Sequence, residues 1–196
     1  MLALLRPALV STLFFTLLLG VGYPLLVTGI AQLAFPAQAN GSLVRDKSGQ
    51  VVGSRLLAQG FSRPEYLHPR PSAAGADGYD AAASSGSNLG PLNPALAERI
   101  GKDAAALRAE AGAPIPADAV TTSGSGLDPH VSPDNARRQA ARIAAARGVA
   151  LAEVERVIAA HVEGPTLGFL GQARVNVLEA NLALDAAFAP AQPSRR

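Results

Sequence analysis

Four residues with the side chains of a serine hydrolase lie within eight positions of one another: Ser123, Ser125, Asp128 and His130. A catalytic triad needs a histidine that contacts the serine and a carboxylate that orients the histidine. Residues this close in one loop rarely reach that geometry. Ser125 also lacks the Gly-x-Ser-x-Gly setting, because Ser123 and Leu127 occupy the glycine positions. We therefore interpret Asp128 and His130 as part of a hydrogen-bonded turn or a protein interface, with a membrane-anchored or secreted periplasmic hydrolase as the alternative.

The histidines offer a second possible chemistry, that of a metal site. His68, His130 and His161 are far apart in the sequence and, with Asp128, lack the spacing of a ligand set, so only the fold could gather them. The absence of cysteine excludes disulfides, thiolate zinc sites and a cysteine nucleophile. The sequence therefore assigns no metal ligand to this chain.

Phosphate chemistry can be tested by pattern. Gly101-Lys102 is followed by Asp103 instead of Ser or Thr, and Leu96 stands where a P-loop needs its first glycine. The pentapeptide Asp-Lys-Thr-Gly-Thr, on which P-type ATPases are phosphorylated, is also absent. The chain is therefore predicted to have no catalytic residue and not to hydrolyse ATP by itself.

An uncharged run from Pro7 to Val44 precedes all of these residues, and its apolar centre covers residues 8–35. About 20 helical residues cross the roughly 30 Å hydrocarbon core of a bilayer, so this centre is predicted to be a transmembrane helix. Pro24 removes one helical hydrogen bond and predicts a kink. Gly20 and Gly22 would let a neighbouring helix approach closely.

A cleaved signal peptide is the competing interpretation of this run, because Arg6 gives a basic start and Ala37-Gln38-Ala39 has the form of a cleavage site. The apolar region of a signal peptide is about 7 to 15 residues long, much shorter than this one, so a retained anchor is favoured. Arg6 on one side faces Arg45 and Lys47 on the other, so charge does not fix the orientation of the helix.

The rest of the chain has the length of one domain. Short apolar runs on both sides of Asp46-Lys47-Ser48-Gly49 predict a β-hairpin, and residues 58–94 predict an ordered, irregular loop with aromatic and leucine anchors. Ser132 is a good helix N-cap and Gly148 a helix stop. The predicted helices cover residues 94–111 (at the periphery), 133–147, 149–164 with Leu151, Val154, Val157, Ile158 and Val162 inward, and a closing segment through Leu178, Leu182 and Phe188.

Charge argues against nucleic acid as a partner. The net charge is only +2, and a basic stripe of the density that nucleic-acid binding needs is absent. Arg137, Arg138, Arg142 and Arg147 lie on one predicted helix, whose pairing with the next helix resembles a helix-turn-helix motif. We interpret these arginines as a solvated face.

Several blocks of residues resemble, in their order along nearly the whole chain, the C subunit (KdpC) of the Kdp potassium-transporting P-type ATPase. The most specific block is the octapeptide from Ser123 to His130. Two small departures from the family pattern, at residues 57–61 and 171–173, lie outside that block. The matching blocks are Arg6-Pro7, Gly22-Tyr23-Pro24, Asn40-Gly41-Ser42, Arg70-Pro71-Ser72-Ala73, Ser84-Ser85-Gly86-Ser87-Asn88, Asn93-Pro94, residues 120–133 and residues 174–179.

The resemblance implies a non-catalytic subunit of a high-affinity, ATP-driven potassium uptake complex in a bacterial inner membrane. Its implied partners are a channel-like potassium-binding subunit, a P-type ATPase subunit, a small single-span subunit and the lipid bilayer. ATP and potassium would be handled by the complex, without a cofactor held by this chain. The family is also described as a catalytic chaperone that raises the ATP affinity of the ATPase subunit.

The fold implied is of the α+β class, with a single N-terminal transmembrane helix followed by one loop-rich exported α/β domain. The expected layout is a short cytoplasmic N-terminus (residues 1–7), the transmembrane helix (8–35), an exported periplasmic domain (40–190) and a frayed tail (191–196). An exported domain cannot meet cytoplasmic ATP, so cofactor-binding residues stay unassigned.

Two Ser-Gly loops are predicted to shape the surface that meets the channel-like subunit. The candidate interface residues are Ser84, Ser85, Gly86, Ser87, Asn88, Ser123, Gly124, Ser125, Gly126, Asp128 and His130, and those for helix packing in the membrane are Gly20, Gly22 and Pro24. A periplasmic sensor or ligand-binding module is a third class of function, which would bind a ligand in its isolated domain.

Overall fold

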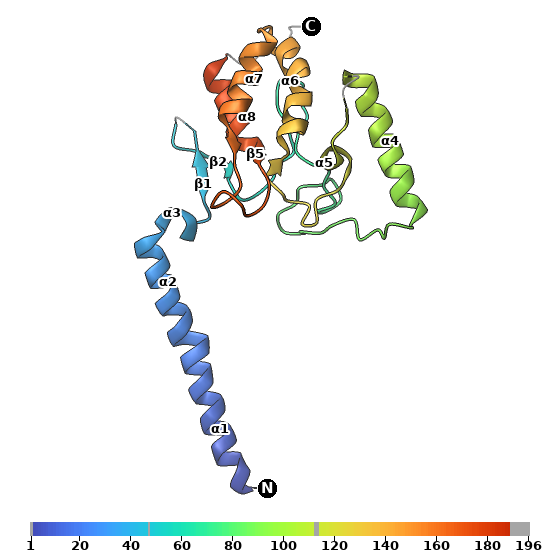
Figure 1. The fold of residues 1–196 in the computed structure, drawn as a ribbon. Coiled ribbons are helices and arrows are strands. Elements are labelled where there is room, and N and C mark those ends of the chain that lie inside the picture. Colours follow the sequence, from blue (N-terminus) through green and yellow to red (C-terminus); the bar gives the residue numbers. More distant parts are fainter. Residues whose placement is uncertain (1, 47, 112–113, 189–196) are drawn as a thin grey trace. The chain divides into compact units, whose positions relative to one another are not determined.

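The computed structural model in Figure 1 describes residues 2–46, 48–111 and 114–188. It is a mixture of helices and short strands, as the predicted α+β class requires. The chain divides into two compact units, Met1–Val52 and Gly53–Arg196. The predicted frayed tail and the last two residues of the predicted exported domain lie outside the described residues.

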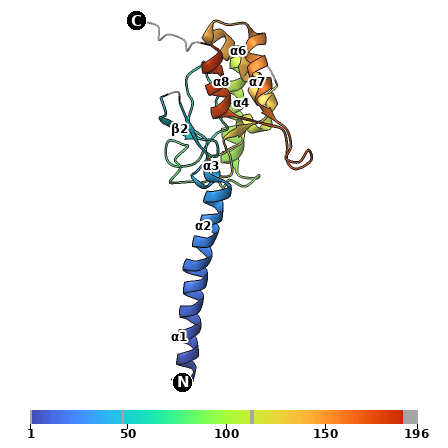
Figure 2. The ribbon, with the colours of Figure 1, turned by 90° about the vertical axis from the view of Figure 1, so that its left-hand side faces the viewer.

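The first unit is built on one long apolar helix. Its helical elements are α1 (Leu2–Leu17), the π-helical segment η1 (Leu18–Gly22), α2 (Tyr23–Ala34) and α3 (Pro36–Ala39). Figure 2 shows α1 to α2 as one continuous rod. The stretch Leu4–Ala34 has 31 residues, a mean hydropathy of 2.0 and no residue buried within the protein, so it is long and apolar enough to cross a membrane.

Just before Pro24, where the sequence predicts a kink, the helix makes a wider turn. The backbone N–H of Tyr23 donates to the carbonyl of Leu18, five residues earlier, in place of the usual four. A π-turn of this kind accommodates a residue that cannot donate a helical hydrogen bond. The helix therefore passes Pro24 and continues to Ala34.

The predicted hairpin is confirmed in β1 (Leu43–Arg45) and β2 (Val51–Ser54), which pair with each other. Its turn is held by the side chain of Asp46, whose Oδ1 accepts from the N–H of Ser48 at 2.8 Å and of Gln50 at 3.0 Å. Gly49 has a φ of +84°, which glycine adopts without strain. Lys47, which belongs to the predicted turn, lies outside the described residues.

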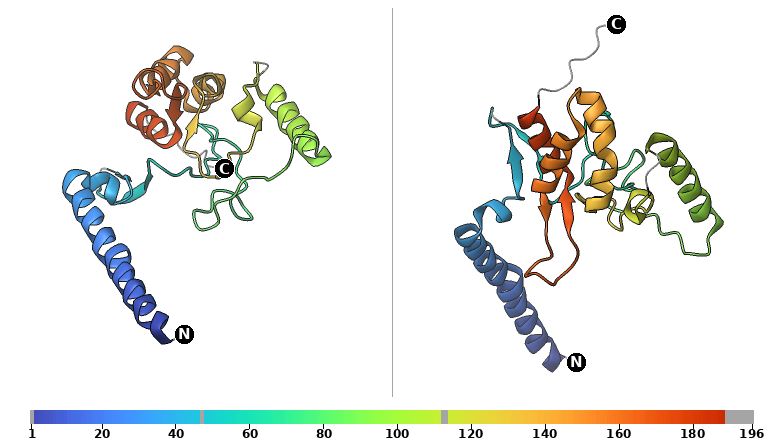
Figure 3. Two further views of the ribbon diagram at one scale, coloured as in Figure 1. Left: turned by 60° about the horizontal axis from the view of Figure 1, so that its bottom comes forward. Right: turned by 45° about the horizontal axis from the view of Figure 1, so that its top comes forward.

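The second unit places helices around a small antiparallel sheet. Its helices are α4 (Pro94–Ala111), α5 (Ala117–Val120), α6 (Pro133–Arg147), α7 (Leu151–Ala160) and α8 (Val177–Ala187), and its strands are β3 (His130–Val131), β4 (Val162–Glu163) and β5 (Arg174–Asn176). Strand β5 is central, with Val175 paired to both Val131 and Val162. Figure 3 shows α6, α7 and α8 gathered together, with α4 standing to one side.

The predicted helix boundaries are mostly confirmed. The Ser132 hydroxyl accepts from the N–H of Asn135 at 3.1 Å and caps α6, and Gly148 ends that helix with a φ of +66°. Helix α4 has its predicted bounds, and none of residues 94–110 is buried, as expected for a peripheral helix.

Helix α7 differs from its prediction at both ends. It ends at Ala160, because Val162 and Glu163 pair with β5 instead of continuing the helix. Leu151, predicted to pack inward, is 44% exposed at the first position of α7, whereas Val154 and Ile158 are buried as expected. The core that these residues join is formed by Leu67, Val131, Ala136, Ala140, Ile143, Ala144, Val154, Ile158, Val175, Val177, Ala180 and Leu184.

The irregular segment between β2 and α4 is ordered, as predicted, because two buried amide side chains bind its backbone. Asn181 of α8 accepts from the N–H of Leu67 at 2.7 Å and donates to its carbonyl at 3.0 Å. Gln139 of α6 bonds the N–H and the carbonyl of His68 in the same way, at 2.8 and 3.1 Å. Each amide replaces a missing strand partner, so Leu67 can be fully buried without losing its backbone hydrogen bonds.

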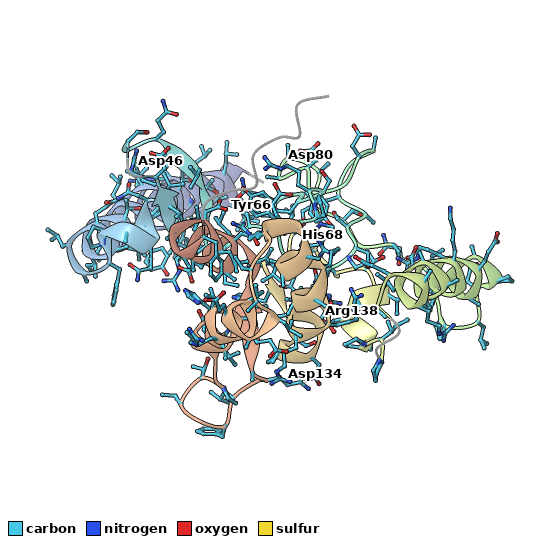
Figure 4. The ribbon with its side chains drawn as sticks, turned by 90° about the horizontal axis from the view of Figure 1, so that it is seen from above. Asp46, Tyr66, His68, Asp80, Asp134 and Arg138 are labelled. Atoms are coloured by element: carbon cyan, nitrogen blue, oxygen red, sulfur yellow. The ribbon has the colours of Figure 1, made fainter. Side chains whose placement is uncertain are left out.

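The interpretation of the α6 arginines as a solvated face is wrong for three of the four. The Arg147 side chain is fully buried and pairs with Asp185 of α8 at 2.7 Å. Arg138 and Arg142 face Glu110 of α4, at 3.6 and 2.7 Å, and Figure 4 shows Arg138 on the side of α6 next to α4. These arginines join helices to one another, and of the four Arg137 alone is mainly exposed.

Candidate functional site

The structure brings the two predicted Ser-Gly loops together. We call residues 84–88 the first Ser-Gly loop and residues 123–130 the second. Two groups of the first loop donate to the carbonyl of Ser125 in the second. They are the backbone N–H of Ser85, at 3.0 Å, and the hydroxyl of Ser84, at 2.9 Å. A Cβ atom at Gly86 would lie 2.8 Å from the carbonyl oxygen of Gly124, so the two backbones meet closely. Segments about 40 residues apart thus form one surface.

Gly126 fixes the second loop against its neighbours. Its φ is +70°, and a Cβ atom there would lie 2.6 Å from the carbonyl oxygen of Ser85 and 2.7 Å from the Cβ of Ala74. Its own carbonyl accepts from the hydroxyl of Ser72 at 2.7 Å. Glycine is therefore required here both for backbone conformation and for space.

Asp128 and His130 form the charged end of the second loop. The Asp128 carboxylate accepts from Nη1 of Arg70 at 2.9 Å and from the N–H of His130 at 3.0 Å, and Nδ1 of His130 lies 3.6 Å from it. Burial alone would raise the pKa of Asp128, but hydrogen bonds from His130 and Arg70 outweigh it and hold the pKa below its ordinary value. The carboxylate is therefore ionised and fixed at neutral pH.

The loops divide into a buried base and an exposed rim. Ser123, Gly126 and Leu127 are buried, and the N–H of Ser123 donates to the carbonyl of Pro71 at 3.0 Å. The exposed residues are Ser84, Asn88, Gly124 and Ser125, and the half-buried ones are Ser85, Gly86, Ser87, Asp128 and His130. The two loops thus present small polar residues, with Asp128 and His130, above a buried base.

The geometry gives no support to serine catalysis. The hydroxyls of Ser123 and Ser125 lie 3.2 Å apart, and Ser125 Oγ accepts from the N–H of Leu127 at 3.0 Å. In the part of the chain that the structure describes, no hydrogen bond joins His130 to either serine. His130 is occupied with Asp128, so a nucleophile paired to a base is not formed.

The histidines lie in separate environments. His68 Nε2 contacts the carbonyl of Arg63 at 3.0 Å, and burial together with the nearby Arg142 lowers the pKa of its ring. His161 Nδ1 contacts the carbonyl of Val157 at 2.8 Å. Within residues 2–46, 48–111 and 114–188, no group of three or more His, Asp or Glu side chains is placed to hold a metal ion.

A pocket of about 610 Å³ is lined in part by Asp128 and His130. Asp118 of α5 forms one wall, and its carboxylate accepts from the N–H and the hydroxyl of Ser132, at 2.8 and 2.9 Å. Arg70 forms another wall through its ion pair with Asp128. Both acidic and basic side chains line the pocket, Asp134 and Arg174 among them.

Sequence reasoning missed Arg70 and Asp118 as members of this site. Arg70 stands 58 positions before Asp128, and only its place in the Arg-Pro-Ser-Ala block singled it out. Asp118 lies in the short helix α5, which the sequence did not predict. The candidate helix-packing residues lie in the first unit, with Gly20 and Gly22 in η1 and Pro24 in α2.

Comparison with known proteins gives matches over almost the whole chain. A protein-family model described as "K+-transporting ATPase, c chain" matches residues 5–186. A protein of Caulobacter sp. (strain K31) is 68% identical over 189 residues, which are 96% of each chain. One of Beijerinckia indica is 60% identical over 98% of each chain, and one of Myxococcus xanthus is 62% identical over 88% of this chain and 83% of its own. All three relatives bear the name "Potassium-transporting ATPase KdpC subunit".

Proposed function

This chain belongs to the family of C chains of K+-transporting ATPases, and from that membership we propose that it is the non-catalytic C subunit of a high-affinity, ATP-driven potassium uptake pump. The observation that carries the proposal is the family match over residues 5–186. The apolar helix Leu4–Ala34 lies almost entirely within that range, so anchor and domain are matched together.

In this proposal the apolar helix holds the chain in a bacterial inner membrane, with its N-terminus in the cytoplasm and its second unit in the periplasm. The partners are a channel-like potassium-binding subunit, a P-type ATPase subunit and a small single-span subunit. A domain of nearly balanced charge, tethered beside its partner, suits permanent docking, because the anchor raises its local concentration and removes much of the cost of association.

Co-purification tests the assembly. The tagged chain is extracted in mild detergent from its own cells, grown at limiting potassium, and the proteins that elute in fixed proportion are identified. We expect a P-type ATPase and a channel-like protein. Elution of the chain alone, from cells shown to express those two proteins, would refute the proposal.

We assign docking on the channel-like subunit to the exposed rim of the two Ser-Gly loops. The rim is supported by a base in which small residues are sterically required, so its shape is fixed before the partner arrives. Gly124 offers a clean probe, because it is exposed and a Cβ atom there would meet nothing within 4 Å. Gly124→Leu should therefore leave the fold intact and weaken assembly.

The matched control for this variant is Gly101→Leu in α4, which is equally exposed and equally open around its Cβ position. It should assemble normally. Replacing Asp128 and His130 by Ala should also weaken assembly or potassium affinity. Normal assembly and normal potassium affinity in both the Gly124 and the Asp128/His130 variants would remove the loops from the interface.

We also propose that this subunit acts as a catalytic chaperone, raising ATP affinity through its membrane partners. A periplasmic domain cannot touch cytoplasmic nucleotide, so the effect would be a coupling free energy between sites on different proteins. In the intact pump, a photoreactive ATP analogue should label the ATPase subunit and leave this chain unlabelled. Labelling of this chain, suppressed by excess ATP, would refute action at a distance.

Gly20, Gly22 and Pro24 are proposed as a packing surface for a neighbouring membrane helix. A Cβ atom at Gly20 would come no closer than 4.0 Å to another atom, and one at Gly22 no closer than 3.5 Å, so the helix itself has room for larger residues. Close approach of another helix would explain small residues here. Gly20→Leu and Gly22→Leu should loosen the complex in detergent, and Ala8→Leu, an equal enlargement near the end of the helix, should not.

A further inference from the structure

The connection between β4 and β5 carries an exposed apolar tip. Residues 164–173 contain no charged side chain. At the tip, Leu167 is 79% exposed, Phe169 73% and Leu170 50%. Figure 3 shows this connection extending away from the helices and the sheet of its unit. Three large apolar side chains within four positions are thus kept in water by the fold of the second unit.

Backbone hydrogen bonds within the tip hold its turn. Thr166 and Leu170 exchange two backbone hydrogen bonds, each of 2.9 Å. The N–H of Gly168 donates to the carbonyl of Pro165 at 3.0 Å, and that of Phe169 to the carbonyl of Thr166 at 3.3 Å. Leu167 takes a φ of +56°, an uncommon conformation for a leucine, to close the turn. The tip therefore presents apolar side chains on a turn in which four backbone N–H groups are bonded internally.

This combination fits lipid better than a protein surface. A protein interface usually surrounds its apolar centre with a polar rim that bonds the partner, and residues 164–173 offer only the side chains of Thr166 and Gln172 for that purpose. The boundary between headgroups and acyl chains, in contrast, accepts apolar side chains without such a rim, and the bonded N–H groups of the turn lower the cost of entering it. Placing a charged side chain in a membrane costs free energy, and residues 164–173 contain no charged side chain.

The chain itself keeps the tip near a bilayer. The apolar helix ends at Ala34 and the second unit begins at Gly53, so fewer than 20 residues join them. Even fully extended, a linker of this length reaches only about 65 Å at roughly 3.4 Å per residue. The second unit is therefore held within about 65 Å of the end of the apolar helix, so its tip can reach the surface of the membrane in which the helix is anchored.

We propose that Leu167, Phe169 and Leu170 insert into the interfacial layer of the bilayer that holds the apolar helix, giving the second unit a second point of attachment. The proposal rests on the membrane anchoring proposed above for the helix. Two points of attachment restrict the orientation of the second unit relative to the membrane plane. The Ser-Gly loops then keep one orientation relative to that plane.

The chain has no cysteine, so single reporters can be placed freely. Leu167→Cys, carrying an environment-sensitive NBD fluorophore, is reconstituted as the full chain in phosphatidylcholine vesicles that contain nitroxide-labelled phosphatidylcholine. Val10→Cys in α1 reports on the anchored helix. Leu92→Cys reports on a single apolar residue that is 96% exposed in the same unit as the tip.

The expected result is a blue-shifted emission at Leu167 and Val10, with quenching by the nitroxide lipid and protection from aqueous iodide, and the opposite behaviour at Leu92. Adding Phe169→Ser and Leu170→Ser to the Leu167 reporter should abolish its lipid quenching. If Val10 is not quenched, the anchoring proposal fails. If Val10 is quenched but Leu167 is open to iodide, the tip proposal alone is overturned.

The same reporters are then measured in the complex that co-purifies with the tagged chain, reconstituted in the same vesicles. Lipid quenching at Leu167 supports the proposal in the assembled state. Protection from iodide at Leu167 without lipid quenching would mean that a protein partner covers the tip, and would overturn it.

Discussion

At the scale of single residues, the Ser-Gly surface depends on positions where a side chain cannot fit. Gly126 combines a positive φ with close contacts to Ser85 and Ala74, whereas a Cβ atom at Gly124, two positions earlier, would meet nothing within 4 Å. The two glycines of one motif therefore have opposite roles. The fold requires glycine at position 126, whereas position 124 has space for a larger side chain.

Gly126→Ala is expected to destabilise the second unit by about 2–4 kcal/mol, because the substitution adds backbone strain and an overlap with backbone atoms. The measurement is thermal unfolding of the full chain in detergent, followed by circular dichroism. Gly124→Ala is the control and should stay within about 0.5 kcal/mol of the original chain. Equal stability of the two variants would show that the loops are not packed as described.

Asp128 should contribute a pH-dependent stabilisation. Its pKa is lower in the folded state than in the unfolded chain, so the stabilisation is complete above the unfolded carboxyl pKa of about 4 and is lost as the pH falls through the folded pKa. Asp128→Asn should cost about 1–3 kcal/mol at neutral pH, since a charged hydrogen bond to Arg70 is lost.

The difference in unfolding free energy between the original chain and Asp128→Asn should then shrink as the pH falls below about 4. Denaturant unfolding at several pH values measures it. Asp77→Asn, at an exposed position, is the control and should give no such difference. A gap between the two curves that is independent of pH would contradict the ion pair with Arg70.

At the scale of elements, α6 is joined to its neighbours by a buried guanidinium. Nε of Arg147 donates to the carbonyl of Glu65 at 2.9 Å, Nη1 to that of Leu184 at 3.3 Å, and Nη2 to the carboxylate of Asp185 at 2.7 Å. The irregular segment, α6 and α8 therefore meet at one side chain. Its charge is paired and its donors are satisfied, as a buried ion requires.

Arg147→Ala is expected to destabilise the chain by about 3–5 kcal/mol, because the Asp185 carboxylate loses its charged partner and three carbonyls, those of Glu65, Leu184 and Phe188, lose a donor. Arg137→Ala removes an exposed pair with Asp134 from the same helix and should cost about 0–1 kcal/mol. Chemical unfolding of both variants measures the contrast. A similar effect of the two changes would contradict the burial of Arg147.

Local features of this fold could be predicted from the sequence, and long-range ones could not. Ser132 and Gly148 gave the bounds of α6, because caps depend only on nearby residues. The end of α7 was missed because strand β4 exists only through its pairing with β5, and the burial of Arg147 was missed because its partners lie far away in the sequence. The two Ser-Gly loops were recognised as motifs, but their contact with each other was visible only in the structure.

At the scale of the whole molecule, one apolar helix and one domain are joined by a short connection. The proposed topology predicts that a cysteine placed at Leu92 reacts with a membrane-impermeant maleimide added outside intact spheroplasts. A cysteine at Leu4 should react only after the membrane is permeabilised. Reaction at Leu4 but not at Leu92 in intact spheroplasts would reverse the orientation.

The order of the elements in the second unit has a consequence for synthesis. The central strand β5 and the amide of Asn181, which holds Leu67 from 114 positions away, leave the ribosome after the irregular segment, α6 and α7. Until they arrive, the irregular segment lacks the amide of Asn181 and the part of its core that β5 and α8 supply, although Gln139 of α6 can already bond His68. A nascent chain that stops before α8 should therefore leave Leu67 exposed and be digested by proteases faster than the full chain.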